Sequence, residues 1–301
     1  MSTDSANALP WPLEAALPAS ELEAELHVPG SNLVLDLHGD PLRARLNVFS
    51  DGNHHMALEQ ALQAFVSEEA DVEDIFYATT PPRVIIDALK GDGIRVGNLR
   101  LSVKPHIFIS PDDVLEALHK QGLIGPHQPV MRSRTLAILV RKKNPKNINS
   151  PEQLLDPAIR LALSNPITEK ASFGVYAAAL CAIGEMAGKP AADTQAYLCS
   201  DQVAHSQIIH HREVPQILAS DLADASLIYY HLALRYTRIF PDTFDLIELD
   251  VRELPDPDRF VTTYHMSVVG DGGEFGEKFQ AFFKSATVAD IYASHGLQPL
   301  D

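Results

Sequence analysis

The sequence predicts an α/β fold built on largely parallel strands. Units of strand, loop and helix recur along the chain, which is the pattern of a parallel sheet covered by helices. The chain has 301 residues, of which 46% are hydrophobic. This is enough for one large or two medium domains with apolar cores, so a globular α/β protein is expected.

The first half of the chain contains three such units. The best defined has a strand at Arg45–Phe49, a glycine-containing loop, and a helix with Leu58, Leu62 and Phe65 on one face. The predicted strands of this half are at 32–37, 45–49, 72–77 and 106–109. Ser110 is predicted to cap the helix that follows the last of these strands.

A second series of strands and helices predicts a second α/β lobe. Its strands are expected at 135–140, 159–164 and 225–230, with a helix at 172–186. A further strand at 261–269 and a last helix at 274–294 are expected at the end of the chain. Residues 1–43 are expected to form a peripheral extension with one short helix near 20–26.

Charge and composition exclude several classes of partner. The net charge of -16 repels nucleic acid and anionic membrane surfaces, and the basic run Arg141, Lys142, Lys143 and Lys146 is interpreted as a solvated loop. No apolar run approaches the roughly 18 residues that span a bilayer, so no membrane insertion is expected. Cys181 and Cys199 are too few for a disulfide framework, although one bridge between them stays open.

The first residues do not resemble a secretory signal. The first basic residue is Arg43, and the early apolar residues are interrupted by Pro10, Pro12 and Pro18. A cytoplasmic location is therefore expected for the chain as written, and a periplasmic one if a leader has been removed.

Short polar side chains follow several predicted strands. Ligands of open α/β sheets bind beyond the carboxyl ends of the strands, where helix N-termini present N–H groups. The residues at these positions are Ser50 and Asn53, Thr79 and Thr80, Ala171 and Ser172, and Tyr229. Such residues also cap helices, but their occurrence in both halves favours a site for a desolvated anion.

Several segments, taken in order, resemble bacterial molybdate-binding proteins and their tungstate-binding relatives. These are ABC-transporter substrate-binding proteins with a type II periplasmic-binding-protein-like fold. The resemblance covers about residues 44–301 and is carried by 47–61, 107–118, 136–148, 151–155, 160–166, 279–286 and 295–299.

The resemblance implies mixed sheets flanked by helices in two lobes, with a ligand cleft at the hinge that closes over a small oxyanion. Lobe 1 would contain 44–132 and 260–301, and lobe 2 would contain 133–259. The protein would serve transport or sensing, with a transporter or a regulatory protein as partner. It would need no cofactor and would not be an enzyme.

Site residues follow from the same resemblance. Asn53 falls at the family's first-loop serine, Thr79 or Thr80 at its second serine, Ala171 or Ser172 at a backbone donor, and Val214 and Tyr229 at its last two contacts. Asn53 departs from the family's serine, because an amide adds a carbonyl acceptor. The identity of the oxyanion is therefore left open.

Two alternatives come from other residues. His54, His55, Tyr229, Tyr230 and His231 resemble the ligand types of ferric-ion-binding proteins with this fold, so a site for Fe³⁺ or Zn²⁺ is a second hypothesis. Adjacent histidines lack the i, i+4 spacing that places two rings on one helix face, which weighs against it.

An enzyme with an organic ligand is the third hypothesis. Asp51 beside His54 could orient a general base, but no nucleophile elbow, phosphate-binding loop or dinucleotide motif completes a mechanism.

Overall fold

The computed structural model describes residues 36–80, 82–91, 93–96, 99–207 and 209–300. They form two compact units, which we call the discontinuous unit (36–132 with 262–300) and the continuous unit (133–261). The boundaries between the units lie between residues 132 and 133 and between residues 261 and 262. The sequence predicted the same first boundary and placed the second between residues 259 and 260. The helix expected near 20–26 lies outside the described residues.

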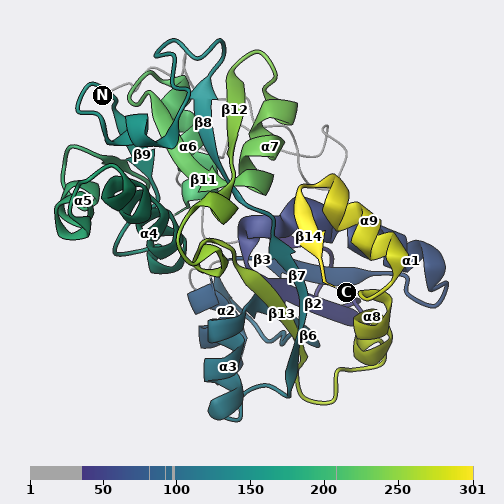
Figure 1. The fold of residues 1–301 in the computed structure, drawn as a ribbon. Coiled ribbons are helices and arrows are strands. Elements are labelled where there is room, and N and C mark those ends of the chain that lie inside the picture. The colour runs from purple at the N-terminus through teal and green to yellow at the C-terminus, as the bar shows by residue number, and fades with distance from the viewer. Residues whose placement is uncertain (1–35, 81, 92, 97–98, 208, 301) are drawn as a thin grey trace. The chain divides into compact units, whose positions relative to one another are not determined.

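The discontinuous unit has a seven-stranded sheet of order β1-β3-β2-β6-β13-β7-β14 (Figure 1). Strands β3, β2 and β6 run parallel, whereas β13 pairs antiparallel with both β6 and β7. Its strands are β1 (Leu37–His38), β2 (Leu46–Ser50), β3 (Ile75–Thr79), β6 (Ile107–Pro111), β7 (His127–Ser133), β13 (Thr263–Val268) and β14 (Leu297–Pro299). A separate two-stranded sheet joins β4 (Ile94–Val96) to β5 (Leu99–Leu101).

Helices cover both faces of this sheet because its central strands are apolar on both sides. One core contains Val48, Leu58 and Phe279, and the other contains Phe49, Ile85 and Leu115. The helices are α1 (His55–Glu68), α2 (Pro82–Lys90), α3 (Asp112–Lys120), α8 (Gly276–Phe282) and α9 (Ala286–Ser294), with α1, α8 and α9 on one face and α2 and α3 on the other (Figure 1).

The continuous unit has a five-stranded sheet of order β10-β9-β11-β8-β12, in which β10, β9 and β11 run parallel. Its strands are β8 (Leu136–Arg141), β9 (Leu161–Leu163), β10 (Ala204–His205), β11 (Ala225–Tyr229) and β12 (Phe244–Leu249). Its helices are α4 (Lys170–Met186), α5 (Ala191–Leu198), α6 (His210–Ala219) and α7 (Tyr230–Ile239), with short 3₁₀ turns η5 (Pro151–Leu155), η6 (Val251–Glu253) and η7 (Pro257–Phe260). The predicted mixed α/β fold, with two sheets flanked by helices, is confirmed.

Two local predictions were wrong. Ser110 was expected to cap a helix, but it lies within β6, and Pro111 takes the N-cap position of α3. One helix was expected over 274–294, but α8 ends at Phe282 and α9 begins at Ala286. Between them, the Ser285 side chain accepts a hydrogen bond from the Val288 N–H and so starts a new helix.

The basic run of the sequence is paired with carboxylates in the continuous unit. Lys142 Nζ lies 2.8 Å from Asp245, and Arg141 contacts both Asp221 and Asp224.

None of the helices in the described part of the chain has the length and apolar character required to cross a membrane.

Asp224, which precedes β11, connects the start of β9 at Arg160 with the end of β8 at Arg141. Its side chain is fully buried and accepts hydrogen bonds from the Arg160 backbone N–H (2.9 Å) and from Arg160 Nη2 (2.7 Å), next to β9. Burial raises the pKa of Asp224, but the hydrogen bonds and charge of Arg160 and the charge of Lys146 outweigh burial and keep the pKa below 3.8.

We expect Asp224→Asn to lower the free energy of unfolding by about 2 kcal/mol at pH 7, since a buried charge-assisted hydrogen bond is lost while Arg160 stays half exposed. Because the folded-state pKa is depressed, this contribution is present above pH 3.8 and is lost as the pH falls below it. Urea denaturation between pH 3 and pH 7 measures both effects. Asp221→Asn is the matched control, since Asp221 pairs with the same arginines but is exposed, and an equal loss in both variants would contradict the account.

Candidate functional site

Polar residues meet at the carboxyl ends of β3, β2 and β6 in the discontinuous unit. Parallel register places Ser50 beside both Thr79 and Ile109. The Thr80 N–H donates to the Ser50 carbonyl oxygen over 3.0 Å, and the Asp51 N–H donates to the Ile109 carbonyl oxygen over 3.3 Å. β2 and β3 therefore end level, and β6 continues beyond them through Ser110 and Pro111 at the same edge of the sheet, where ligands of open α/β sheets bind.

Internal hydrogen bonds hold the first of these ends in place. Ser50 Oγ lies 2.9 Å from His54 Nε2, and His54 Nδ1 lies 3.1 Å from the Tyr292 hydroxyl of α9. Burial raises the pKa of Tyr292 well above 10, so that this hydroxyl keeps its proton. Asn53 lies half-buried in the turn η4 (Gly52–His54), and its N–H donates to Asp51 Oδ1.

The second strand end is tied to the neighbouring edge strand. The Thr79 hydroxyl donates to Asp36 Oδ2 over 2.7 Å, and the Thr79 N–H donates to the Asp36 carbonyl oxygen. Burial raises the pKa of Asp36, but hydrogen bonds from His38 and Thr79 outweigh burial and bring the pKa below its ordinary value. The proton of Thr79 is thus directed at an ionised carboxylate, while Thr80 lies buried one residue further on.

The third strand end carries a residue that the sequence did not indicate as a ligand contact. Ser110 is fully buried, and its Oγ has no hydrogen-bond partner among the described residues. Buried hydroxyls almost always have a partner. Sequence analysis interpreted Ser110 as a helix cap, and only the strand register shows that it lies near the carboxyl end of β6, at the same edge as Ser50.

The continuous unit has a comparable edge. Ser164 follows β9, is fully buried, and also has no hydrogen-bond partner for its Oγ among the described residues. Ser206 follows β10, and its N–H donates to the Leu163 carbonyl oxygen. Tyr229 ends β11, where its N–H lies 3.4 Å from the hydroxyl of Tyr176.

Glu169 organises this second edge. Its carboxylate accepts hydrogen bonds from the Ser206 hydroxyl, the His210 N–H (2.8 Å) and the His210 ring (2.8 Å). Burial raises the pKa of Glu169, but the charge and hydrogen bonds of His210 and the bond from Ser206 outweigh burial and lower the pKa below 4.5. Glu169 is also the N-cap residue of α4, so it joins the N-terminus of α4 to that of α6.

The other predicted contacts of this unit lie on α4 and α6. Ala171 is exposed and Ser172 is buried, both in the first turn of α4, which has no side-chain cap. The Ser172 hydroxyl donates to the Glu169 carbonyl oxygen over 3.2 Å. Val214 lies beyond the first turn of α6, and its side chain is fully buried in the apolar core.

The residues of the metal hypothesis belong to two units. His54 and His55 lie in the discontinuous unit, where His55 Nδ1 bonds the Gly52 carbonyl oxygen. Tyr229, Tyr230 and His231 lie in the continuous unit, where the His231 ring stacks on Tyr229 at 5.3 Å between centroids. The Arg134 guanidinium lies over the Tyr230 ring at 4.9 Å.

Residues 46–298 match the family of bacterial extracellular solute-binding proteins. The chain therefore belongs to this family, which confirms the resemblance to substrate-binding proteins. A comparison with curated protein sequences found no match.

Solved structures of periplasmic binding proteins share the fold. The sulfate-binding protein SubI from Mycobacterium tuberculosis has a TM-score of 0.60 and 15% identity, over 85% of this chain and 86% of that chain. The periplasmic molybdate-binding protein of Azotobacter vinelandii has a TM-score of 0.57 and 15% identity, over 85% and 100%. Iron-bound HitA from Pseudomonas aeruginosa has a TM-score of 0.57 and 12% identity, over 84% and 85%.

We expect Glu169→Gln to lower the thermal midpoint and to speed amide hydrogen exchange in the first turn of α6. The amide cannot accept three hydrogen bonds as a carboxylate does, and this loss costs about 1 to 3 kcal/mol. Each kcal/mol lowers the midpoint by about 4 °C in a unit of this size. Glu185→Gln, on the exposed side of α4, is the control and should change neither quantity. Unchanged exchange in α6 for Glu169→Gln would remove Glu169 from its positioning role.

Proposed function

We propose that this protein binds a small tetrahedral oxyanion of the molybdate, tungstate or sulfate type through uncharged donors at its strand ends. The observation that carries the proposal is the pair of buried hydroxyls, Ser110 and Ser164, without partners among the described residues. Leaving a buried hydroxyl without a partner costs free energy, and a bound oxyanion would supply the missing acceptor.

The charge of the protein supports donors of this kind. With a net charge of -16, the overall field repels an anion, so affinity must come from local dipoles. The uncapped first turn of α4 offers backbone N–H groups at the positive end of a 17-residue helix, close in sequence to Ser164. Hydroxyls and N–H groups together hold an anion without the desolvation of a cationic side chain.

Ser50, Asn53, Thr79 or Thr80, the backbone at Ala171 and Ser172, Val214 and Tyr229 remain the proposed further contacts. The Thr79 hydroxyl already donates to Asp36, which favours Thr80 of that pair. Val214 would contribute its backbone alone, because its side chain lies in the core.

We also propose that the protein delivers its ligand to a membrane transporter outside the cytoplasm. The family is described as extracellular, which favours the periplasmic one of the two locations considered. A sensor that reports to a regulatory protein is the alternative use of the same site.

The metal hypothesis rests on the histidines and on the likeness to iron-bound HitA. Both ring nitrogens of His54 already lie within hydrogen-bond distance of Ser50 and Tyr292, which weakens this hypothesis. The hypothesis of an enzyme with an organic ligand is supported by none of the side-chain contacts described for the two strand edges. Both alternatives are therefore kept as outcomes of the binding experiment.

We expect molybdate, tungstate or sulfate to raise the thermal midpoint, since a ligand at 100 times its Kd stabilises the folded state by about 2.7 kcal/mol. Ser110→Ala and Ser164→Ala should each weaken that binding by about 1 to 3 kcal/mol in a calorimetric titration, with little change in the stability of the ligand-free protein. The reason is that each variant removes a hydroxyl that has no acceptor among the described residues and that would donate to the anion.

Ser226→Ala is the matched control, because Ser226 Oγ is equally buried and has no partner among the described residues, but Ser226 lies near the amino end of β11, away from the carboxyl ends of the strands. The affinity of the Ser226→Ala variant for the oxyanion should equal that of the unsubstituted protein. Stabilisation by Fe³⁺ or Zn²⁺ and by no oxyanion, or by no ion at all, would overturn the oxyanion proposal.

A further inference from the structure

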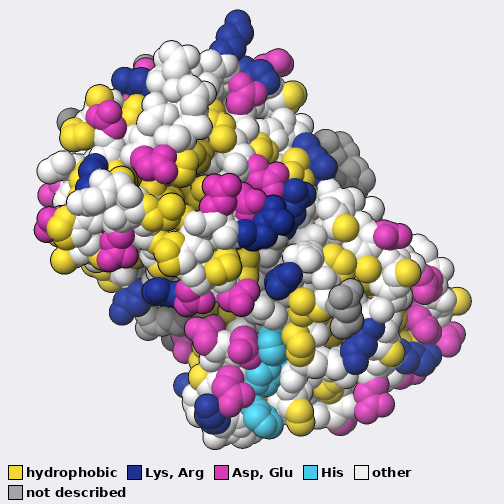
Figure 2. Space-filling view, viewed as in Figure 1, with side chains coloured by type: hydrophobic (Ala, Val, Ile, Leu, Met, Phe, Trp, Pro, Cys, Tyr) yellow, Lys and Arg dark blue, Asp and Glu magenta, His cyan; other side chains and the backbone are white. Residues whose placement is uncertain are grey.

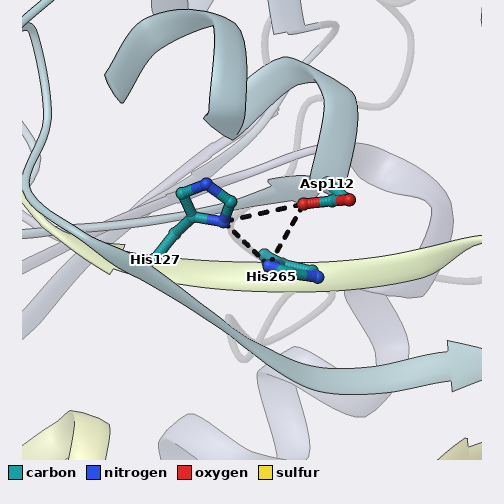
Figure 3. Close-up of side chains that lie close together, drawn as sticks. All are labelled: Asp112, His127 and His265. Carbon is teal, nitrogen blue, oxygen red and sulfur yellow. Dashed lines mark hydrogen bonds and ion pairs between the residues drawn. The ribbon is translucent and has the colours of Figure 1, made fainter. Parts of the chain in front are cut away.

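Three side chains of the discontinuous unit converge on one point, away from the residues considered above as metal ligands. Asp112 is the first residue of α3, His127 is the first residue of β7, and His265 lies in β13. Figure 3 shows their polar atoms directed toward one another. In the described part of the chain, no other group of three or more histidine, cysteine or acidic side chains comes together in a way that could hold a metal ion.

The distances between these atoms match those around a bound metal ion. His127 Nδ1 lies 2.8 Å from His265 Nδ1, and Asp112 Oδ1 lies 3.4 Å from His265 Nδ1 and 3.7 Å from His127 Nδ1. Ligand atoms at 2.0–2.1 Å from a tetrahedral Zn²⁺ are about 3.3 Å apart. The observed separations bracket this value.

Glu116 fixes the orientation of one imidazole. It lies one turn after Asp112 on α3, and its Oε2 lies 3.0 Å from His127 Nε2. With the Nε2 proton directed at this carboxylate, Nδ1 presents its lone pair to the other two residues. Histidines that bind metals usually hold their second nitrogen against a carboxylate in this way.

Regular secondary structure places all three residues, so the cluster is preorganised. β7 and β13 are antiparallel neighbours, and the register between them shifts at Tyr264 and His265, which places His265 opposite Pro129. Such bulges redirect side chains. α3 packs against β13 and brings Asp112 to the same face.

The cluster is accessible from solvent. Asp112 is 60% exposed, whereas the side chains of His127 and His265 are 9% and 14% exposed. Figure 2 shows histidine side chains at the surface near α3, flanked by acidic ones. Acidic surroundings attract cations, and an exposed carboxylate leaves room for water in a fourth coordination position.

We propose that Asp112, His127 and His265 bind one divalent transition-metal ion, with Zn²⁺ as the best fit to two imidazole nitrogens and one carboxylate oxygen. Glu116 acts as the positioning residue. The ion would link α3 to β7 and β13, the two strands through which the chain leaves and re-enters the discontinuous unit. This proposal is independent of oxyanion binding, since it uses none of the residues proposed for that function.

The test is a titration of the full chain, freed of metal by chelation, with Zn²⁺ in competition with a chromophoric chelator. One site per chain is expected. His127→Gln and His265→Gln should each weaken it at least 100-fold, and Glu116→Gln, which removes the outer carboxylate, by about 10- to 100-fold. Co²⁺ should give the visible absorption of a tetrahedral site, and His265→Gln should abolish it.

His119→Gln is the matched control. The His119 ring lies 6.1 Å from that of His127, but His119 Nδ1 is directed at the Ile124 carbonyl oxygen, so its loss should leave the Zn²⁺ affinity unchanged. Thermal unfolding without metal checks that each variant is folded, and Glu116 is exposed enough to be replaced safely. An equal loss in His119→Gln, or retained affinity in folded His127→Gln and His265→Gln, would overturn the proposal.

Discussion

Parallel pairing of β2 with β3 and β6 is the constraint on which the rest of the site depends. It brings Ser50, Thr79 and Ser110 to one edge of the sheet, although Ser50 and Ser110 are 60 residues apart in sequence. The same pairing leaves the central strands apolar on both faces, so helices must cover both. The continuous unit follows the same rule with β10, β9 and β11, which bring Ser164, Ser206 and Tyr229 to a second edge.

Binding by neutral donors makes physical sense for so acidic a chain. The basic residues near β8 are paired with Asp221, Asp224 and Asp245, so they serve the stability of the continuous unit. Glu169 likewise serves the scaffold. Its carboxylate is hydrogen-bonded by His210 and Ser206, and these bonds order two helix N-termini. In this account, charged groups hold the scaffold, while hydroxyls and backbone N–H groups contact the ligand.

Local patterns predicted most elements, because apolar periodicity and strand ends are properties of short segments. The strand expected at 45–49 is β2, and the helix expected after it is α1. Ser110 was misassigned because a serine before proline and two aspartates also fits a helix cap, and only the pairing of β6 decides between the two. The break at Ser285 was missed because apolar residues continue with helical spacing on both sides of it.

The cluster of Asp112, His127 and His265 lay beyond sequence reasoning for a different reason. Its histidines are 138 residues apart, and only the pairing of β7 with β13 brings them together. The polar strand ends at Ser50, Thr79 and Tyr229, by contrast, could be predicted, because strand ends are visible in the sequence.

The central claim is that an anion lies at these ends, and the most direct measurement is anomalous diffraction from crystals grown with tungstate. The account predicts a tungsten peak that places an oxygen of the tungstate within hydrogen-bond distance of Ser110 or Ser164, and a peak near neither residue would contradict it.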